Sequence, residues 1–106
     1  MTDLEITRLC AEAMGFEWSR PKFQSHSQVW ISDGDSDKWK LFDPLHDDVQ
    51  AMALVKKIGL DIHCSADMNG WYVMCNRLRE AFFINEDLNR AICECVAEMQ
   101  SAKASA

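Results

Sequence analysis

Three residues of types that bind metals or act as nucleophiles lie in the second half of the chain: His63, Cys64 and Cys75. Imidazole and thiolate groups are ligands that Zn²⁺ prefers, and a cysteine beside a histidine is the pair on which many thiol nucleophiles depend. These residues could converge only if their two segments pair as a hairpin. Cys93 and Cys95 could add ligands, but residues two apart on a helix point to different sides, and zinc knuckles usually read Cys-x-x-Cys. Buried thiols are the favoured interpretation, and we expect no metal and no catalytic residue. A small metal-dependent or thiol enzyme using His63, Cys64 and Cys75 is the alternative.

A run of alternating aspartates, Asp33, Asp35 and Asp37, invites a calcium hypothesis. An EF-hand loop needs Gly at its sixth position and a bidentate Glu at its twelfth. Counted from Asp33, the twelfth residue is Pro44 and the nearest glycine, Gly34, is misplaced. The run therefore reads as a solvated hairpin turn.

The composition restricts the classes of partner. The chain has 106 residues, 48% of them apolar, and a net charge of −6 from 11 basic and 17 acidic side chains. A protein with net negative charge is not attracted to nucleic acid or to an anionic membrane by long-range electrostatics, so basic protein surfaces are the favoured partners. No apolar run approaches the ~20 residues of a membrane span. The absence of a signal-peptide pattern and an odd set of five cysteines favour the cytoplasm, and no cofactor is expected.

The elements that must position these residues are organised around the stretch 42–59. It predicts the end of a strand, an Asp-Pro stop and one central helix. Asp43 and Asp47 both suit the N-cap, and Gly59 suits a left-handed C-terminal stop. We expect the helix to bury an apolar stripe at spacings of three and four. That stripe consists of Leu45, Val49, Met52, Ala53 and Lys56, widened by Leu54, Val55 and Ile58.

Two β-hairpins and two further helices surround this stretch. Thr2 and Glu5 form a capping box for a leading helix, and Asn85 is the expected cap of a final helix. The fold class is therefore α+β, in the order helix, hairpin, helix, hairpin, helix. We predict one domain over 1–106, with a leading helix and aromatic cap at 1–18 and β-β-α units at 29–59 and 60–100. A four-stranded, mostly antiparallel sheet in an α/β/α sandwich follows, and its exposed edges allow a homodimer.

Several short motifs resemble a known family. Phe42-Asp43-Pro44, followed by Asp48, Ala51 and Leu54-Val55-Lys56-Lys57-Ile58-Gly59-Leu60, is similar to the central signature of the phage ABA sandwich domain family. Met14-Gly15-Phe16, Gly70-Trp71-Tyr72-Val73 and Leu88-Asn89-Arg90-Ala91-Ile92-Cys93 resemble its first helix end, second strand pair and final helix. The resemblance implies an α/β/α sandwich carried by small proteins of tailed phages and prophages. It brings no established reaction and no site residues.

The functional expectation is a non-enzymatic phage or prophage accessory protein in the cytoplasm of a bacterial host. It would act by binding a host or phage protein with a basic surface, without direct contact with nucleic acid or a membrane. A more specific form is a counter-defence inhibitor, such as an anti-CRISPR protein, whose carboxylates mimic nucleic acid. The candidate partner-binding residues are Asp33, Asp35, Asp37, Trp39, Asp47 and Asp48.

Overall fold

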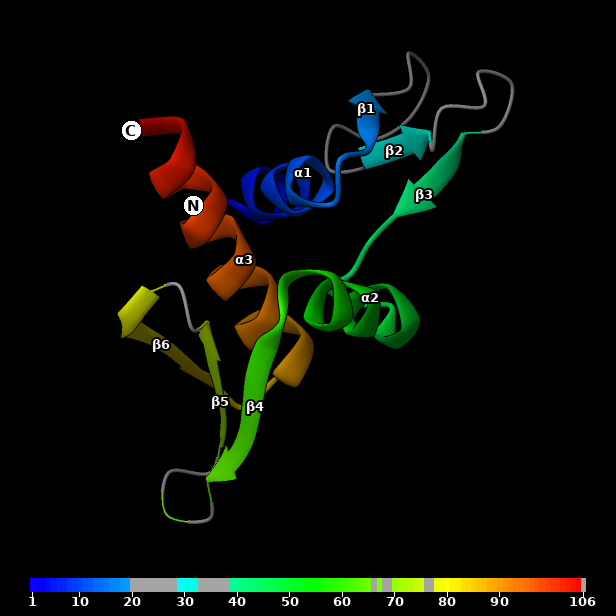
Figure 1. Ribbon diagram of the computed structural model, residues 1–106. Coiled ribbons are helices and arrows are strands. Elements are labelled where there is room, and N and C mark those ends of the chain that lie inside the picture. The colour runs from blue at the N-terminus through cyan, green and yellow to red at the C-terminus, as the bar shows by residue number, and fades with distance from the viewer. Residues whose placement is uncertain (20–28, 33–38, 66, 68–69, 76–77, 106) are drawn as a thin grey trace.

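The computed structural model describes residues 1–19, 29–32, 39–65, 67, 70–75 and 78–105 (Figure 1). In chain order the elements are α1 (Asp3–Ala13), β1 (Glu17–Ser19), β2 (Val29–Ser32), β3 (Lys40–Phe42), α2 (Asp48–Ile58), β4 (Leu60–Ser65), β5 (Gly70–Cys75), β6 (Leu78–Asn85) and α3 (Leu88–Ser105). The α+β class is confirmed. Within the described ranges, no helix has the length and apolar character that a membrane crossing requires.

The strands form two antiparallel sheets, ordered β1-β2-β3 and β4-β5-β6, so the expected single four-stranded sheet is wrong. Each predicted hairpin gains a third strand from a neighbouring segment. Trp18 of the expected aromatic cap lies opposite Ile31, and Ile84 of β6 lies opposite Tyr72. Because α2 separates the two hairpins, they extend with local strands instead of pairing with each other.

The helices lie between the two sheets in Figure 1. Sheet β1-β2-β3 lies against α1 at one end of the molecule, and α3 covers one face of sheet β4-β5-β6 at the other. The order of layers thus differs from an α/β/α sandwich, in which helices flank a sheet on both faces.

The helix predicted within 42–59 is confirmed as α2, but the helix at the centre of the packing is α3. Helix α3 packs against α1, α2, β5 and β6. Its buried residues are Ala91, Ile92, Cys93, Cys95, Val96 and Ala97. Cys93 and Cys95 point to different sides, as expected, yet both are buried because both sides are covered. The carbonyl of Cys93 accepts a hydrogen bond from the thiol of Cys10 on α1 at 3.5 Å. Small side chains let neighbouring elements approach α3 from two directions.

The ends of α2 agree with the sequence, but its buried face does not. The Asp47 carboxylate accepts a hydrogen bond from the backbone N–H of Gln50 at 3.1 Å, and Gly59 ends the helix at φ 81°. The buried residues are Ala51 and Leu54, whereas Val49 is 79% exposed and Met52 is 41% exposed. The predicted stripe through Val49 and Met52 therefore faces solvent.

The other two helix starts are also defined by side-chain caps. Thr2 and Glu5 form the expected capping box of α1. The carboxylate of Asp87 accepts from the backbone N–H groups of Asn89 at 3.0 Å and Arg90 at 3.4 Å, so Asp87 and not Asn85 caps α3. Asn85 instead accepts a hydrogen bond from the Asp87 N–H at 2.9 Å, which fixes the turn that precedes the helix.

Candidate functional site

Four large apolar side chains are exposed on β3, on α2 and at the residue that precedes β3. These are Trp39 (43%), Leu41 (38%), Val49 (79%) and Met52 (41%). Scattered single apolar residues are normal on a surface, but a local group of them marks an interaction site. We call these four residues, together with the exposed acids Asp47 and Asp48, the β3–α2 surface.

Gln50 joins the two elements that carry this surface. Its side-chain amide N–H donates to the backbone carbonyl of Leu41 at 3.0 Å, and its side-chain oxygen accepts from the backbone N–H of Asp43 at 2.6 Å. The Gln50 side chain thus provides hydrogen-bond partners for two backbone groups at the end of β3, the Leu41 carbonyl and the Asp43 N–H. Val49 precedes Gln50 on α2, so this link joins the first turn of the helix, which carries Val49, to the end of the strand that carries Leu41.

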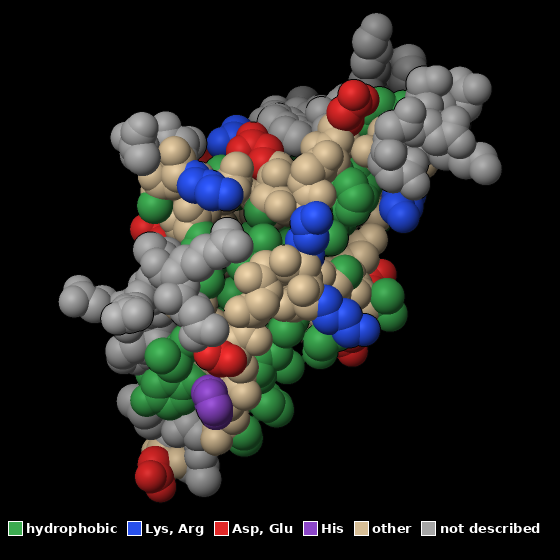
Figure 2. All heavy atoms as spheres, in the orientation of Figure 1, with side chains coloured by type: hydrophobic (Ala, Val, Ile, Leu, Met, Phe, Trp, Pro, Cys, Tyr) green, Lys and Arg blue, Asp and Glu red, His purple; other side chains and the backbone are tan. Residues whose placement is uncertain are grey.

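Acidic and basic side chains lie at opposite ends of α2. Asp47 and Asp48 lie at the N-terminal end of α2, where the Asp48 carboxylate accepts a hydrogen bond from the Asn89 side chain at 2.8 Å. Lys56 and Lys57 lie in the last turn. Figure 2 shows Lys or Arg side chains beside apolar ones over α2. A partner would therefore meet acidic groups at one end of the helix and basic groups at the other, which fixes its orientation.

A hollow of about 310 Å³ adjoins this surface between α1 and the β3–α2 connection. It is lined by Asp3, Thr7, Leu41, Phe42, Asp43, Leu45 and His46. His46 Nδ1 lies 3.0 Å from both carboxylate oxygens of Asp43, while the Thr7 hydroxyl donates to the Asp3 carbonyl at 2.7 Å. The only hydroxyl among these lining residues is thus engaged by a helix carbonyl.

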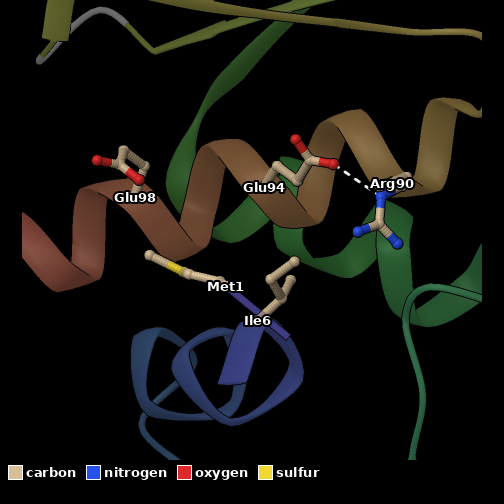
Figure 3. A pocket seen from close by; sticks show the side chains of 5 residues that line it. All are labelled: Met1, Ile6, Arg90, Glu94 and Glu98. Carbon is tan, nitrogen blue, oxygen red and sulfur yellow. Dashed lines mark hydrogen bonds and ion pairs between the residues drawn. The ribbon is translucent and has the colours of Figure 1, made fainter. Parts of the chain in front are cut away.

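A second hollow, of about 190 Å³, lies where the start of α1 meets α3 (Figure 3). Arg90 donates to Asp3 and to Glu94, each at 2.8 Å, and its pKa is raised chiefly by the hydrogen bond to Asp3. Both of its ion pairs are internal to the chain. This arginine therefore fastens α1 to α3, and we assign the hollow a structural role.

The structure does not bring His63, Cys64 and Cys75 together. Cys64 lies opposite Trp71 in the sheet, whereas Cys75 lies opposite Leu60. Four residues of strand separate the two thiols, about 13 Å. His63 and Cys64 are consecutive and so point to opposite faces. The alternative enzyme therefore has no assembled site at these three residues, and no group of three or more potential metal ligands occurs elsewhere in the described part of the chain.

The buried thiols are packed as apolar groups. Cys10, Cys75, Cys93 and Cys95 are buried and Cys64 is exposed. Burial raises the pKa of Cys95 to about 12, with a smaller contribution from Cys75. The pKa of Cys10 is raised by its hydrogen bond with Cys93 and by burial. Such thiols are poor nucleophiles and poor metal ligands at neutral pH.

The predicted partner-binding residues divide into two groups. Asp33, Asp35 and Asp37 lie outside the described residues. Trp39, Asp47 and Asp48 are exposed on the β3–α2 surface.

Sequence reasoning missed the apolar members Leu41, Val49 and Met52. One signal was available: the supposed core stripe through Val49 and Met52 ended at Lys56, a residue that is almost never fully buried without a partner.

Comparison with family models, with curated proteins and with solved structures gave no match for this chain.

Proposed function

We propose that this protein is a non-enzymatic binding module that engages another protein through the β3–α2 surface. One observation carries the proposal: Trp39, Leu41, Val49 and Met52 are exposed on two elements that Gln50 joins. Burial of apolar area supplies most of the affinity of protein interfaces, and a tryptophan is the residue type most enriched among their energetic anchors.

The acids at the start of α2 give this surface its preferred partner. Asp47 and Asp48 carry two negative charges beside the exposed Val49, and the protein as a whole has a net charge of −6. A basic patch next to an apolar pocket on the partner would complement both features. Charges at the rim mainly raise the association rate, whereas the apolar centre sets the residence time.

The more specific form of the proposal is a phage or prophage accessory protein that acts in a bacterial cytoplasm. In that form it is a counter-defence inhibitor, such as an anti-CRISPR protein, whose carboxylates occupy a groove that normally holds nucleic acid. Its support is the net charge, the aspartate run at 33–37 and the family resemblance of the sequence motifs.

The test is quantitative affinity capture from bacterial lysate with three variants. V49S/M52S removes apolar area, and because both side chains are exposed the fold should persist. D47N/D48N removes two charges but keeps the helix cap and the acceptor for Asn89, since Asn also caps helices. D67N/E86Q removes two charges from exposed residues elsewhere and is the charge-matched control.

We expect one protein to be recovered by wild type and by the control, and its recovery by V49S/M52S to fall by more than about tenfold, as for the loss of an interface anchor. D47N/D48N should slow association, and its deficit should shrink at high salt. A fourth variant, D33N/D35N/D37N, is added to these three and tests nucleic-acid mimicry. Equal recovery of the same protein by wild type and V49S/M52S would refute the proposal.

A further inference from the structure

Strand β4 is an edge strand whose outer side is unpaired among the described residues. It pairs only with β5, through six residues from Leu60 to Ser65. In Figure 1 its lower half extends away from α2, and no described element lies along the side of β4 that faces away from β5. Exposed edges are normally blunted by lysine, proline or a bulge, and β4, with the sequence LDIHCS, has no lysine or proline. The register shift recorded among the described residues of this sheet lies between Met74 and Cys75 on β5, not on β4.

The two faces of β4 differ in character. Leu60, Ile62 and Cys64 share the face of Val73, which is buried against the core. Asp61 and His63 share the opposite face, opposite Met74 and Tyr72, and both are exposed. Figure 2 shows a histidine and an acidic side chain close together along β4, with apolar side chains beside them.

We propose that β4 pairs antiparallel with β4 of a second copy of this chain, with Ile62 on the two-fold axis. Antiparallel pairing about an axis perpendicular to the sheet places residues whose numbers sum to a constant opposite each other on the same face. With Ile62 opposite Ile62 of the second copy, Asp61 lies opposite His63 on both sides of the axis. On the core face, Leu60 lies opposite Cys64 on both sides.

Hydrogen-bonding complementarity selects this register. A shift that puts Asp61 on the axis places two carboxylates opposite each other, and a shift that puts His63 on the axis places two imidazoles opposite each other. Two carboxylates directly opposite destabilise a strand pair, whereas a carboxylate opposite an imidazole can accept a hydrogen bond from it. Only the Ile62-centred register gives two carboxylate–imidazole pairs on one face and an unbroken apolar row on the other.

The product is a continuous six-stranded sheet with both α3 helices on one face. Its open face carries the two Asp61–His63 pairs between the Tyr72 and Met74 side chains of both copies. The β3–α2 surface is formed by other elements, so this proposal stands independently of the binding function proposed above.

Sedimentation equilibrium from about 5 μM to 1 mM tests the proposal, with a charge-swap cycle on exposed residues. D61H places imidazoles opposite each other and H63D places carboxylates opposite each other. Two lost cross-strand pairs should raise the dimer Kd by about 3- to 30-fold in each single variant. D61H/H63D restores both pairs and should return Kd to the wild-type value. Far-ultraviolet circular dichroism checks that each variant is folded.

Mild oxidation of wild type supplies a second measurement of the register. In the Ile62-centred pair, the two Cys64 residues are about 13 Å apart along the strands, too far for a disulfide. We therefore expect no acceleration of cross-linking on dimerisation. A wild-type protein that stays monomeric at 1 mM, a Kd unchanged by D61H and H63D, a double variant that does not recover, or rapid Cys64–Cys64 cross-linking would each overturn the proposal.

Discussion

The exposed face of α2 can be tested by two substitutions on the same helix, Val49→Ala and Leu54→Ala. Val49 is 79% exposed and Leu54 is 0% exposed. Fully burying a valine side chain contributes about 1.5–3 kcal/mol, so the fifth of Val49 that is covered accounts for about 0.5 kcal/mol. Alanine regains a similar amount through its higher helix propensity, about 0.5 kcal/mol. We expect Val49→Ala to leave the free energy of unfolding unchanged within about 0.5 kcal/mol.

Leu54→Ala should behave very differently. It removes a fully buried side chain and leaves a cavity, for which the cost is about 2–5 kcal/mol. That is a large fraction of the 5–15 kcal/mol that stabilises an ordinary domain. Urea titration followed by tryptophan fluorescence and by circular dichroism measures both variants. If Val49→Ala cost as much as Leu54→Ala, the amphipathic stripe read from the sequence would be the buried one, and the β3–α2 surface would not exist.

Three further predictions concern thiols, a helix end and the link between β3 and α2. A thiol reagent at pH 8 should modify Cys64 promptly and the four buried cysteines only after unfolding. Burial raises the pKa of Cys95 to about 12, so the unfolded state loses this proton at a lower pH than the folded state. The free energy of unfolding should therefore fall as the pH rises from about 9 to 12, and a pH series of urea titrations measures it. Gly59→Ala should cost about 1–2 kcal/mol by thermal or urea unfolding, because φ is 81° while no atom lies within 4 Å of an added Cβ; Gly59→Asn should cost less, since Asn tolerates this conformation. Gln50→Ala should lower the free energy of unfolding by about 1–3 kcal/mol, because two hydrogen bonds are lost. It should also raise the rate of hydrogen exchange at the Asp43 N–H, which donates to Gln50. An unchanged exchange rate there would contradict the link between β3 and α2.

Local signals predicted the start of α1 and both ends of α2, but not the cap of α3. Thr2 and Glu5 cap α1, Asp47 caps α2 and Gly59 ends it, because each of these depends on residues within one turn. The strand pairs Val29–Phe42 and Leu60–Cys75 also follow from hairpin patterns. Such features need no knowledge of distant contacts.

Tertiary features were harder to predict. Helix α2 has apolar residues on nearly every side, so periodicity alone could not choose between the Leu54 face and the Val49 face. Small residues such as Cys93 and Ala97 contribute little to a hydrophobic pattern, although they let α1 approach α3. Half of the candidate site was predicted, and its other three residues, Leu41, Val49 and Met52, were missed because they looked like core.

The claim that the β3–α2 surface binds a protein is tested most directly by comparing V49S/M52S with D67N/E86Q, a double substitution at exposed residues outside this surface, in quantitative capture. We predict that the control recovers the wild-type partner in full and that V49S/M52S, shown to be folded by circular dichroism, recovers less than about a tenth of it. Full recovery of the same partner by V49S/M52S would contradict the claim.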